Sequence, residues 1–433
     1  MNREQVQSEA LQALINNSGG TCVLSTGTGK SKVAIDYIKH SNSKSILITS
    51  PRTNLKENWF KELRKWGFMN RGTSYDIWQC PWDGLNMEIN LVNIQTCYKW
   101  SEEQLQKYDL IIADEIHTMT TPEYGQLLIN AKELNITTIG LTGTPDDKKK
   151  DKFLFYQKYC PIVYRYLDSA KDGIVNKRKY IVFEYELDDI MQTTVTTKTK
   201  SWRVGEKKQY NYIQSQIDRG EELIRNILRV PKEDYVNYFG YAKAWYFNKD
   251  IAKEKKDAGG TYIRGITARQ ELLWNLNSTA QLANRLAFHI QDTFKDSKVL
   301  VFSARTEQAE NISKYCVHSK NNDELNKERL NAFNLGTIKQ LGSCYSLTLG
   351  LNLTHAEFAI MESYNGSDVQ FKQKAGRLDR LGVDNNAIVT FIVVKNTQGE
   401  KWFNNSVTFD EYDEVRIVKS IKEFKEALIE LMF

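Results

Sequence analysis

The sequence predicts an α/β protein with two parallel-sheet domains in tandem and a mostly helical insertion in the second. Its 433 residues are more than one hydrophobic core usually serves, so at least two domains are expected. Short apolar runs alternate with amphipathic segments in two separate stretches, and a Lys- and Tyr-rich stretch interrupts the second. We place the domains at 1–167 and 168–433, with the insertion at about 190–268.

The first domain is predicted from five apolar runs between Thr21 and Leu141. Each run has the length of a strand, and amphipathic segments separate them, a pattern typical of βα units around a buried parallel sheet. Ligand sites of such sheets lie at the carboxyl ends of the strands, where polar residues collect in this chain. The predicted strands are Cys22–Leu24, Ser45–Thr49, Ile89–Ile94, Leu110–Ala113 and Thr137–Leu141.

The second sheet is predicted from a further set of apolar runs that begins near Tyr180. The stretch from about Lys198 to Ala268 separates the first of these runs from the others, and we expect it to be mostly helical and to close with Gly259 and Gly260. The predicted strands are Tyr180–Phe183, Lys298–Phe302, Ala356–Ile360 and Ala387–Val393.

The bulk composition is typical of a folded, cytoplasmic protein. A net charge of +5 permits contact with a polyanion without demanding it, so any nucleic-acid surface must be local. Six cysteines without a CxxC pair argue against a disulfide framework or a structural zinc site. The polar N-terminus and the lack of a long apolar run predict no membrane segment. The charged run Asp146–Lys152 is expected to be a solvated loop.

A phosphate-binding loop is predicted between the first strand and the helix that follows it. Gly27 and Gly29 would let backbone N–H groups approach the phosphates. Lys30 would neutralise the β- and γ-phosphates, and Ser31 would ligate Mg²⁺. The strict form of this pattern has Gly where the chain has Leu24. The predicted ATP contacts are Thr26, Gly27, Thr28, Gly29, Lys30 and Ser31.

Two adjacent carboxylates follow the apolar run that ends at Ala113. Phosphoryl transfer needs one carboxylate to hold the metal ion and another group to orient the attacking water. Asp114 suits the first task and Glu115 the second. His117, taken alone, would more often be a packed or capping histidine.

With this Asp-Glu-Ile-His sequence in place, the chain resembles the DExH-type superfamily 2 helicases, in which the Ser-Thr-Gly-Thr-Gly-Lys-Ser form of the loop is usual. That resemblance implies two RecA-like domains with ATP and Mg²⁺ in the cleft between them. Further segments resemble the remaining helicase motifs in order. They are Ser50–Leu55 for motif Ia, Ile94–Thr96 for Ib, Leu141–Pro145 for III, Lys298–Thr306 for IV, Thr348–Leu353 for V and Gln373–Arg380 for VI.

The same resemblance implies that the second domain contributes to the ATP site. Arg377 and Arg380 lie one helical turn apart on one face and would act as arginine fingers at the γ-phosphate. Gln373 would contact the γ-phosphate or the attacking water. Gly350 of motif V would also contact the nucleotide. Gln7 is the nearest match to a glutamine that reads adenine.

A nucleic-acid track is implied by the resemblance of motifs Ia, Ib, IV and V, which grip one strand through its sugar–phosphate backbone. The insertion also carries basic residues among aromatics. These could hold phosphates and stack bases, or the aromatics could form the insertion's own core. The predicted track residues are Arg52, Thr53, Thr96, Ser303, Arg305 and Thr348.

The predicted function is that of an ATP-dependent DNA helicase that unwinds or remodels branched DNA in recombination, repair or replication. Asp-Glu-Ile-His and Thr-Gly-Thr-Pro, without an HRxGRxGR motif, disfavour RNA helicases of the DEAD-box kind. With the Gly173–Lys179 stretch, they resemble small UvsW-like phage helicases, which are also similar to Swi/Snf-type translocases. A double-strand DNA translocase, an RNA helicase and an inactive nucleic-acid-binding module remain alternatives. We expect a monomer in the cytoplasm, that of the host if phage-encoded, with single-stranded or branched DNA and recombination or replication proteins as partners.

Overall fold

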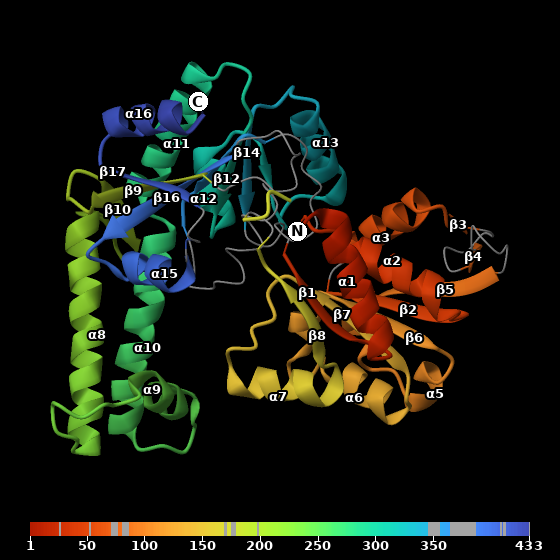
Figure 1. Ribbon diagram of the computed structural model, residues 1–433. Coiled ribbons are helices and arrows are strands. Elements are labelled where there is room, and N and C mark those ends of the chain that lie inside the picture. The colour runs from red at the N-terminus through yellow and green to blue at the C-terminus, as the bar shows by residue number, and fades with distance from the viewer. Residues whose placement is uncertain are drawn as a thin grey trace.

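The chain folds into two α/β units, and a long helical arm extends from the second, as the computed structural model in Figure 1 shows. The boundary predicted between residues 167 and 168 falls in the connection between the last strand of the first sheet and the first strand of the second. The structure describes residues 1–25, 27–51, 53–70, 77–79, 86–168, 171–174, 179–196, 199–344, 356–363, 387–407, 409 and 413–432.

The first unit contains an eight-stranded sheet in the order β3-β4-β5-β2-β6-β7-β1-β8. All pairings from β5 to β8 are parallel, whereas β3 and β4 add an antiparallel edge. The strands are β1 (Gly20–Leu24), β2 (Ser45–Ser50), β3 (Met69–Asn70), β4 (Ile77–Gln79), β5 (Asn86–Asn93), β6 (Leu110–Asp114), β7 (Thr137–Thr142) and β8 (Ile162–Tyr166).

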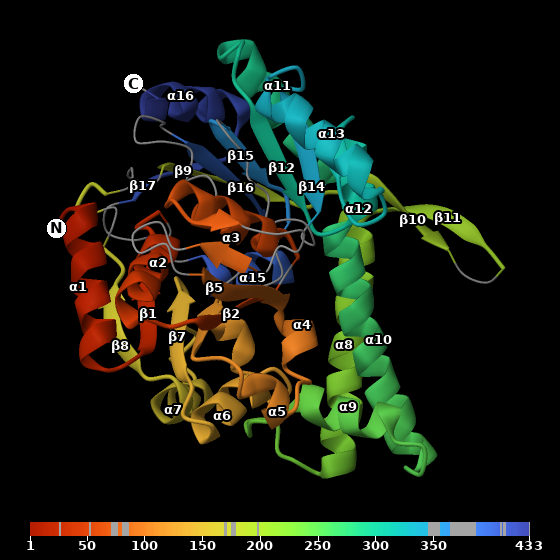
Figure 2. The same cartoon turned by 90° about the vertical axis from the view of Figure 1, so that its right-hand side faces the viewer.

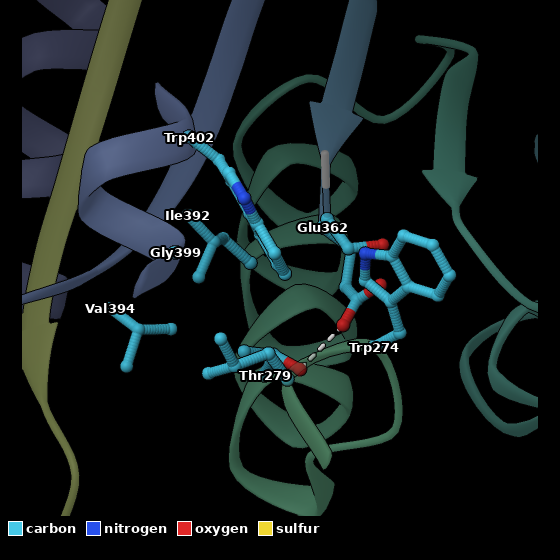
Figure 3. Close-up of a pocket in the computed structure, with 9 residues that line it drawn as sticks. Trp274, Thr279, Glu362, Ile392, Val394, Gly399 and Trp402 are labelled. Atoms are coloured by element: carbon cyan, nitrogen blue, oxygen red, sulfur yellow. Dashed lines mark hydrogen bonds between the residues drawn. The ribbon is translucent and has the colours of Figure 1, made fainter. Parts of the chain in front are cut away.

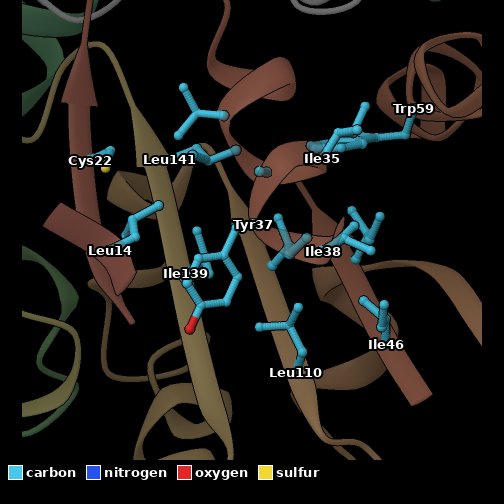
Figure 4. Close-up of a cluster of buried hydrophobic side chains, with 14 of the residues drawn as sticks. Leu14, Cys22, Ile35, Tyr37, Ile38, Ile46, Trp59, Leu110, Ile139 and Leu141 are labelled. Carbon is cyan, nitrogen blue, oxygen red and sulfur yellow. The ribbon is translucent and has the colours of Figure 1, made fainter. Parts of the chain in front are cut away.

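Both faces of this sheet are covered, which explains why its central strands are continuously apolar. Ile46 and Leu110 belong to one core, formed with α1, α2 and α3 and shown in Figure 4. Leu47 and Ile111 belong to the core on the opposite face, formed with the other helices. The helices are α1 (Arg3–Asn16), α2 (Lys30–Ser41), α3 (Thr53–Lys65), α4 (Ile94–Cys97), α5 (Glu102–Leu105), η1 (Ile116–Met119), α6 (Gln126–Glu133) and α7 (Lys150–Tyr159).

The second unit contains a seven-stranded, all-parallel sheet in the order β13-β14-β12-β15-β16-β9-β17. Helices α11 and α16 pack on one face, and α13 and α15 on the other. The strands are β9 (Lys179–Glu186), β12 (Val299–Ser303), β13 (Cys316–Val317), β14 (Gln340–Cys344), β15 (Phe358–Met361), β16 (Ile388–Lys395) and β17 (Glu414–Val418). The helices are α11 (Asn277–Thr293), α12 (Thr306–Ile312), α13 (Asp323–Asn334), α15 (Gln398–Ser406) and α16 (Ile421–Met432).

The insertion between β9 and β12 forms a two-stranded ribbon followed by the arm. In the arm, α8 and α10 run side by side and α9 packs near the far end (Figures 1 and 2). The elements are β10 (Gln192–Thr196), β11 (Ser201–Gly205), α8 (Glu206–Leu228), α9 (Tyr238–Phe247) and α10 (Lys253–Trp274). The arm therefore continues past the predicted end at Ala268, up to Trp274.

Glycines set the close packing of the arm, and this corrects the predicted role of Gly259 and Gly260. Both lie inside α10 and are buried. A Cβ on Gly259 would lie 2.8 Å from the Ala242 carbonyl oxygen, and one on Gly220 would lie 2.8 Å from the Tyr262 backbone. These glycines let helices approach closely rather than ending the insertion.

The charged run Asp146–Lys152 is only partly a loop, which also corrects the sequence prediction. Helix α7 begins at Lys150 and is anchored by the buried ring of Tyr156. Within the loop, Asp147 pairs with Arg165 of β8 and Asp146 pairs with Lys149 at 2.8 Å. Another difference is that Ile94, predicted to end a strand, begins α4. Among the described residues, no helix combines the length and the apolar character needed to cross a membrane.

Candidate nucleotide site and nucleic-acid track

Three of the predicted motifs follow neighbouring strands of the first sheet. The phosphate loop comes after β1, Thr142 ends β7, and Asp114 ends β6. Since β7 lies between β6 and β1 and pairs in parallel with both, the three motifs meet at one carboxyl edge. That edge is where open α/β sheets bind ligands.

The phosphate loop depends on glycines with left-handed backbone conformations. Gly27 has a φ of 86° and Gly29 a φ of 97°, values that favour glycine. A Cβ on Gly29 would lie 2.3 Å from the Gln7 amide nitrogen. The Gln7 side chain donates a hydrogen bond to the Thr28 carbonyl oxygen at 2.8 Å. Gln7 is thus packed against the loop, and its adenine contact stays a prediction.

The residues around this loop fit a triphosphate. Lys30 begins α2 directly after Gly29, so the amide groups and the positive end of the helix dipole are available to an anion. The Lys30 ammonium lies 3.4 Å from the Leu24 carbonyl oxygen, beside the end of β1. The Ser25 hydroxyl is buried, and no hydrogen-bond partner is found for it among the described residues. A phosphate oxygen would satisfy this hydroxyl.

The Asp114 carboxylate is oriented by a residue that the sequence did not reveal. The indole N–H of Trp59, in α3, donates to Asp114 Oδ2 at 2.9 Å. The Glu115 backbone N–H donates to Asp114 Oδ1 at 3.0 Å. Trp59 is only 2% exposed, and a buried indole N–H usually has a partner. A buried Trp59 could therefore have suggested a polar hydrogen-bond acceptor near its indole N–H. The sequence does not show that this acceptor is Asp114.

Glu115 and His117 connect the carboxylate strand to the strand beside it. Glu115 has a left-handed φ of 51°, a conformation that is uncommon for residues other than glycine and often marks functional sites. His117 Nδ1 lies 2.9 Å from Thr142 Oγ1 and 3.4 Å from Glu115 Oε2. Burial lowers the pKa of His117, although the Glu115 carboxylate opposes this shift. Burial thus favours the neutral imidazole, and its Nδ1 lies between Glu115 and Thr142 of motif III.

Ser303 and Arg305, the predicted track residues of the second unit that the structure describes, lie at the carboxyl end of β12, where the first is buried and the second is paired. Ser303 is fully buried, which leaves its hydroxyl turned away from solvent. The guanidinium of Arg305 pairs with Glu271 and lies 4.9 Å from the centre of the Trp274 ring. Both partners belong to α10 at the root of the arm. In the first unit, Thr96 is exposed on α4.

A small pocket lies at the same root, between Trp274 and Trp402 (Figure 3). Glu362, directly after β15, is 2% exposed there. Its carboxyl accepts hydrogen bonds from Thr279 and, at 3.0 Å, from Gln308. Burial raises the pKa of Glu362, and these hydrogen bonds oppose the shift. Glu362 thus ties α11 and α12 to the sheet and was not suggested by the sequence.

Several predicted site residues lie outside the described residues. Of Thr53 only the backbone, at the start of α3, is described. The roles assigned to all of these residues stay predictions. The residues outside are Thr26, Arg52, Thr348, Gly350, Gln373, Arg377 and Arg380.

Both α/β units match models of known protein families. Residues 1–147 match the family described as "Type III restriction enzyme, res subunit", and residues 281–382 match the "Helicase conserved C-terminal domain". The chain is an ATP-hydrolysing protein of helicase superfamily 2. This superfamily 2 protein is 26% identical over 400 residues to the DNA 3'-5' translocase XPB2 of Sulfurisphaera tokodaii, covering 90% of this chain and 81% of that protein.

Solved structures show the same fold. The Hef helicase domain of Pyrococcus furiosus superposes with a TM-score of 0.55 at 14% identity, covering 94% of this chain and 97% of that one. S. cerevisiae Dbp5 bound to RNA and ADP BeF3 gives a TM-score of 0.55 at 10% identity, covering 99% and 92%. The predicted architecture of two RecA-like parallel-sheet domains is therefore confirmed.

Proposed function

We propose that this superfamily 2 protein is an ATP-driven DNA motor that moves along DNA and unwinds or remodels forks and junctions. The observation that carries the proposal is the meeting of the phosphate loop, Asp114–Glu115 and Thr142 on three adjacent strands. The similarity to a DNA 3'-5' translocase over 90% of this chain supports DNA as the polymer. We extend the 3'-to-5' direction to this chain as part of the proposal.

The described residues divide the work of ATP hydrolysis among them. Lys30 and the amide groups at the start of α2 bind phosphate oxygens, and Ser31 with Asp114 would hold Mg²⁺. MgATP supplies the phosphoryl group that is transferred to water. Trp59 keeps the Asp114 carboxylate in one orientation, and Glu115 is placed to orient the attacking water. Arg377, Arg380 and Gln373 complete the site in this proposal.

His117 and Thr142 offer a path from hydrolysis to movement. His117 contacts Glu115 on one side and Thr142 on the other. The Thr142 hydroxyl also accepts a hydrogen bond from the Thr144 backbone N–H at 3.0 Å, so it fixes the turn of motif III. A change at Glu115 on hydrolysis would therefore reach motif III through the His117 ring, whose Nδ1 lies between the Glu115 carboxylate and the Thr142 hydroxyl.

The experiment that tests this proposal is an ATPase measurement with different polymers. The rate is measured with no polymer and with single-stranded DNA, duplex DNA, a four-way junction or RNA. We expect strong stimulation by DNA, with the junction at least as effective as linear duplex, and weaker stimulation by RNA. A rate that no polymer changes would contradict the motor proposal. Stimulation by RNA alone would show that RNA, and not DNA, is the substrate.

A second candidate is a double-strand translocase that does not separate strands, and the similarity to a protein named as a DNA 3'-5' translocase favours movement along DNA as the core activity. Strand displacement from a fork and displacement of a third strand from a triplex distinguish the two. A helicase performs the first, whereas a pure translocase performs only the second. The UvsW-like assignment, the role in recombination, repair or replication, the cytoplasmic setting and the monomeric state belong to the same proposal.

A further inference from the structure

A two-stranded ribbon at the start of the insertion has no place in the ATP site or the predicted track. Strands β10 and β11 pair antiparallel with each other and with no other strand of the described chain. The ribbon extends away from both sheets in Figure 2. An isolated two-stranded ribbon is marginally stable in water, so this ribbon depends on the contacts at its base.

The two faces of the ribbon differ in chemistry. Thr194 pairs across the strands with Arg203, and Thr196 pairs with Ser201. These four residues share one face because directly paired residues point to the same side, and all four are exposed. The opposite face carries the Val195–Trp202 pair, with Trp202 47% exposed. One face thus offers hydroxyl groups and a guanidinium, and the other offers an indole.

The charge of the ribbon is entirely positive. No Asp or Glu occurs from Ile190 to Gly205, whereas Lys198, Lys200 and Arg203 do. The exposed residues Lys207 and Lys208 follow at the start of α8. Within the described part of the chain, no ion pair involves Arg203, Lys207 or Lys208. Local charge of one sign on a protein of nearly balanced composition favours a polyanion as partner.

Hydrogen bonds tie the base of the ribbon to α11 of the second unit and to the start of α8. Glu206, which follows β11, is fully buried and accepts a hydrogen bond from the Asn277 backbone N–H at 2.6 Å. The Asn277 side chain donates to the Gln192 carbonyl oxygen at 2.7 Å. The Asp189 carboxylate accepts from the Lys208 backbone N–H at 2.9 Å. A ribbon anchored in this way can transmit force between a bound polymer and the motor.

We propose that the β10–β11 ribbon binds double-stranded DNA, with its Thr194–Arg203 face against the phosphates bordering a groove. A two-stranded ribbon has the width that the major groove of B-DNA admits. Arg, Ser and Thr side chains are the usual donors to phosphate oxygens. Single-stranded binding instead needs several aromatic platforms along a groove, whereas this ribbon presents only Trp202.

The test measures binding of the nucleotide-free, full-length chain to a short blunt duplex and to the same sequence as a single strand. The variant carries Lys200→Glu and Arg203→Glu. We expect duplex affinity to fall at least about tenfold and the slope of log affinity against log salt to decrease by about 2, one unit for each lost phosphate contact. Single-strand affinity should change less than about twofold, because the track lies elsewhere.

A matched control carries the same charge change on the exposed residues Lys243 and Lys249 near the far end of the arm. The neutral variant Lys200→Gln with Arg203→Gln guards against a ribbon that simply unfolds, and should also lose duplex affinity. Equal weakening by the control and the ribbon variant, or equal loss for duplex and single strand, would overturn the inference.

This inference rests on the proposed function only in taking DNA as the polymer. If DNA does not stimulate the ATPase of the unaltered chain, the proposed function fails whatever the ribbon binds. If DNA does stimulate it and the ribbon variants bind duplex normally, only the ribbon inference fails.

Discussion

The two α/β units share one plan but differ in what fixes their functional side chains. In the first unit, the phosphate loop, Asp114 and Thr142 are carried by short connections at one sheet edge. In the second, the insertion enters between β9 and β12, and the root of its arm holds Arg305 through Glu271 and Trp274. The ATP-site residues of the first unit are thus positioned by neighbouring strands. The predicted track residue Arg305 of the second unit is positioned by contacts between segments that are distant in the sequence.

This difference indicates where mutations should act. Changes at the edge of the first sheet should alter the chemistry of ATP hydrolysis itself. Changes at the root of the arm should alter binding of nucleic acid while leaving the chemical step intact. Substitutions in each unit can therefore separate the two effects.

Removal of the phosphate-loop lysine or the water-orienting carboxylate should abolish turnover. We expect Lys30→Ala and Glu115→Gln each to lower the DNA-stimulated ATPase rate at least about 100-fold, because each removes a group that acts on the transition state. Glu115→Gln should still bind ATP, whereas Lys30→Ala should bind it weakly, as nucleotide titration would show. Near-normal ATPase rates in both variants would show that ATP is not hydrolysed at the carboxyl edge of the first sheet.

Loss of the indole N–H at Asp114 should weaken metal binding without removing the core ring. In Trp59→Phe we expect the Mg²⁺ requirement of the ATPase to rise about tenfold, as is typical when the support of a metal ligand is lost. Trp66→Phe is the matched control, because the Trp66 indole donates at 3.1 Å to Glu62 rather than to the site. An unchanged Mg²⁺ titration in Trp59→Phe would show that this hydrogen bond has no functional role.

The buried His117 should make folding stability depend on pH. Burial lowers its pKa from 6.5, Lys30 lowers it further, and the carboxylates of Glu115 and Asp146 oppose the shift. The unfolded imidazole therefore takes up a proton at higher pH than the folded one. The free energy of unfolding should fall as the pH drops below about 6.5, until the folded pKa is passed.

Chemical denaturation of His117→Asn at a series of pH values checks this expectation. The variant should lose part of the pH dependence, and the exposed His40→Asn serves as its control. Identical pH dependence in the unaltered chain and His117→Asn would contradict the pKa argument. The ATPase rate of His117→Asn should fall less than that of Glu115→Gln, because His117 positions its neighbours rather than reacting.

Release of Arg305 from the arm should have the smallest effect. Glu271→Gln removes the ion pair, in which Arg305 is 40% and Glu271 48% exposed, so solvent already screens the attraction. We expect single-stranded DNA to bind about two- to threefold more tightly, since such pairs contribute less than about 1 kcal/mol. ATP turnover at saturating DNA should not change. Weaker DNA binding would show that the pair supports the track.

The parallel strands could be predicted where burial on both faces demands apolar runs, as in β2, β6 and β16. Strand β14, with the sequence Gln-Leu-Gly-Ser-Cys, was missed because it carries few large apolar residues. The ribbon was missed because Thr-rich strands with one exposed face resemble a polar loop. In the arm, Gly259 and Gly260 were predicted to end the insertion because glycine often follows the end of a helix. In the structure they lie inside α10, where they allow close helix packing.

The candidate site divides in the same way. Lys30, Asp114 and Glu115 could be identified because each belongs to a short motif whose spacing the chemistry fixes. Trp59 could not, because the contact to Asp114 joins residues 55 positions apart. Arg305 was predicted as a DNA contact from its motif, and its pairing with Glu271 depends on the fold of the arm. The contact of Arg305 with DNA stays a prediction.

Directional movement on DNA is the most direct test of the proposed motor. Displacement of streptavidin from single-stranded DNA biotinylated at either end is followed with ATP, for the unaltered chain and for Lys30→Ala. We predict faster release from the 5′ end than from the 3′ end, and release at the spontaneous rate for Lys30→Ala. Release at the spontaneous rate from both ends by the unaltered chain would contradict an ATP-driven motor on this strand.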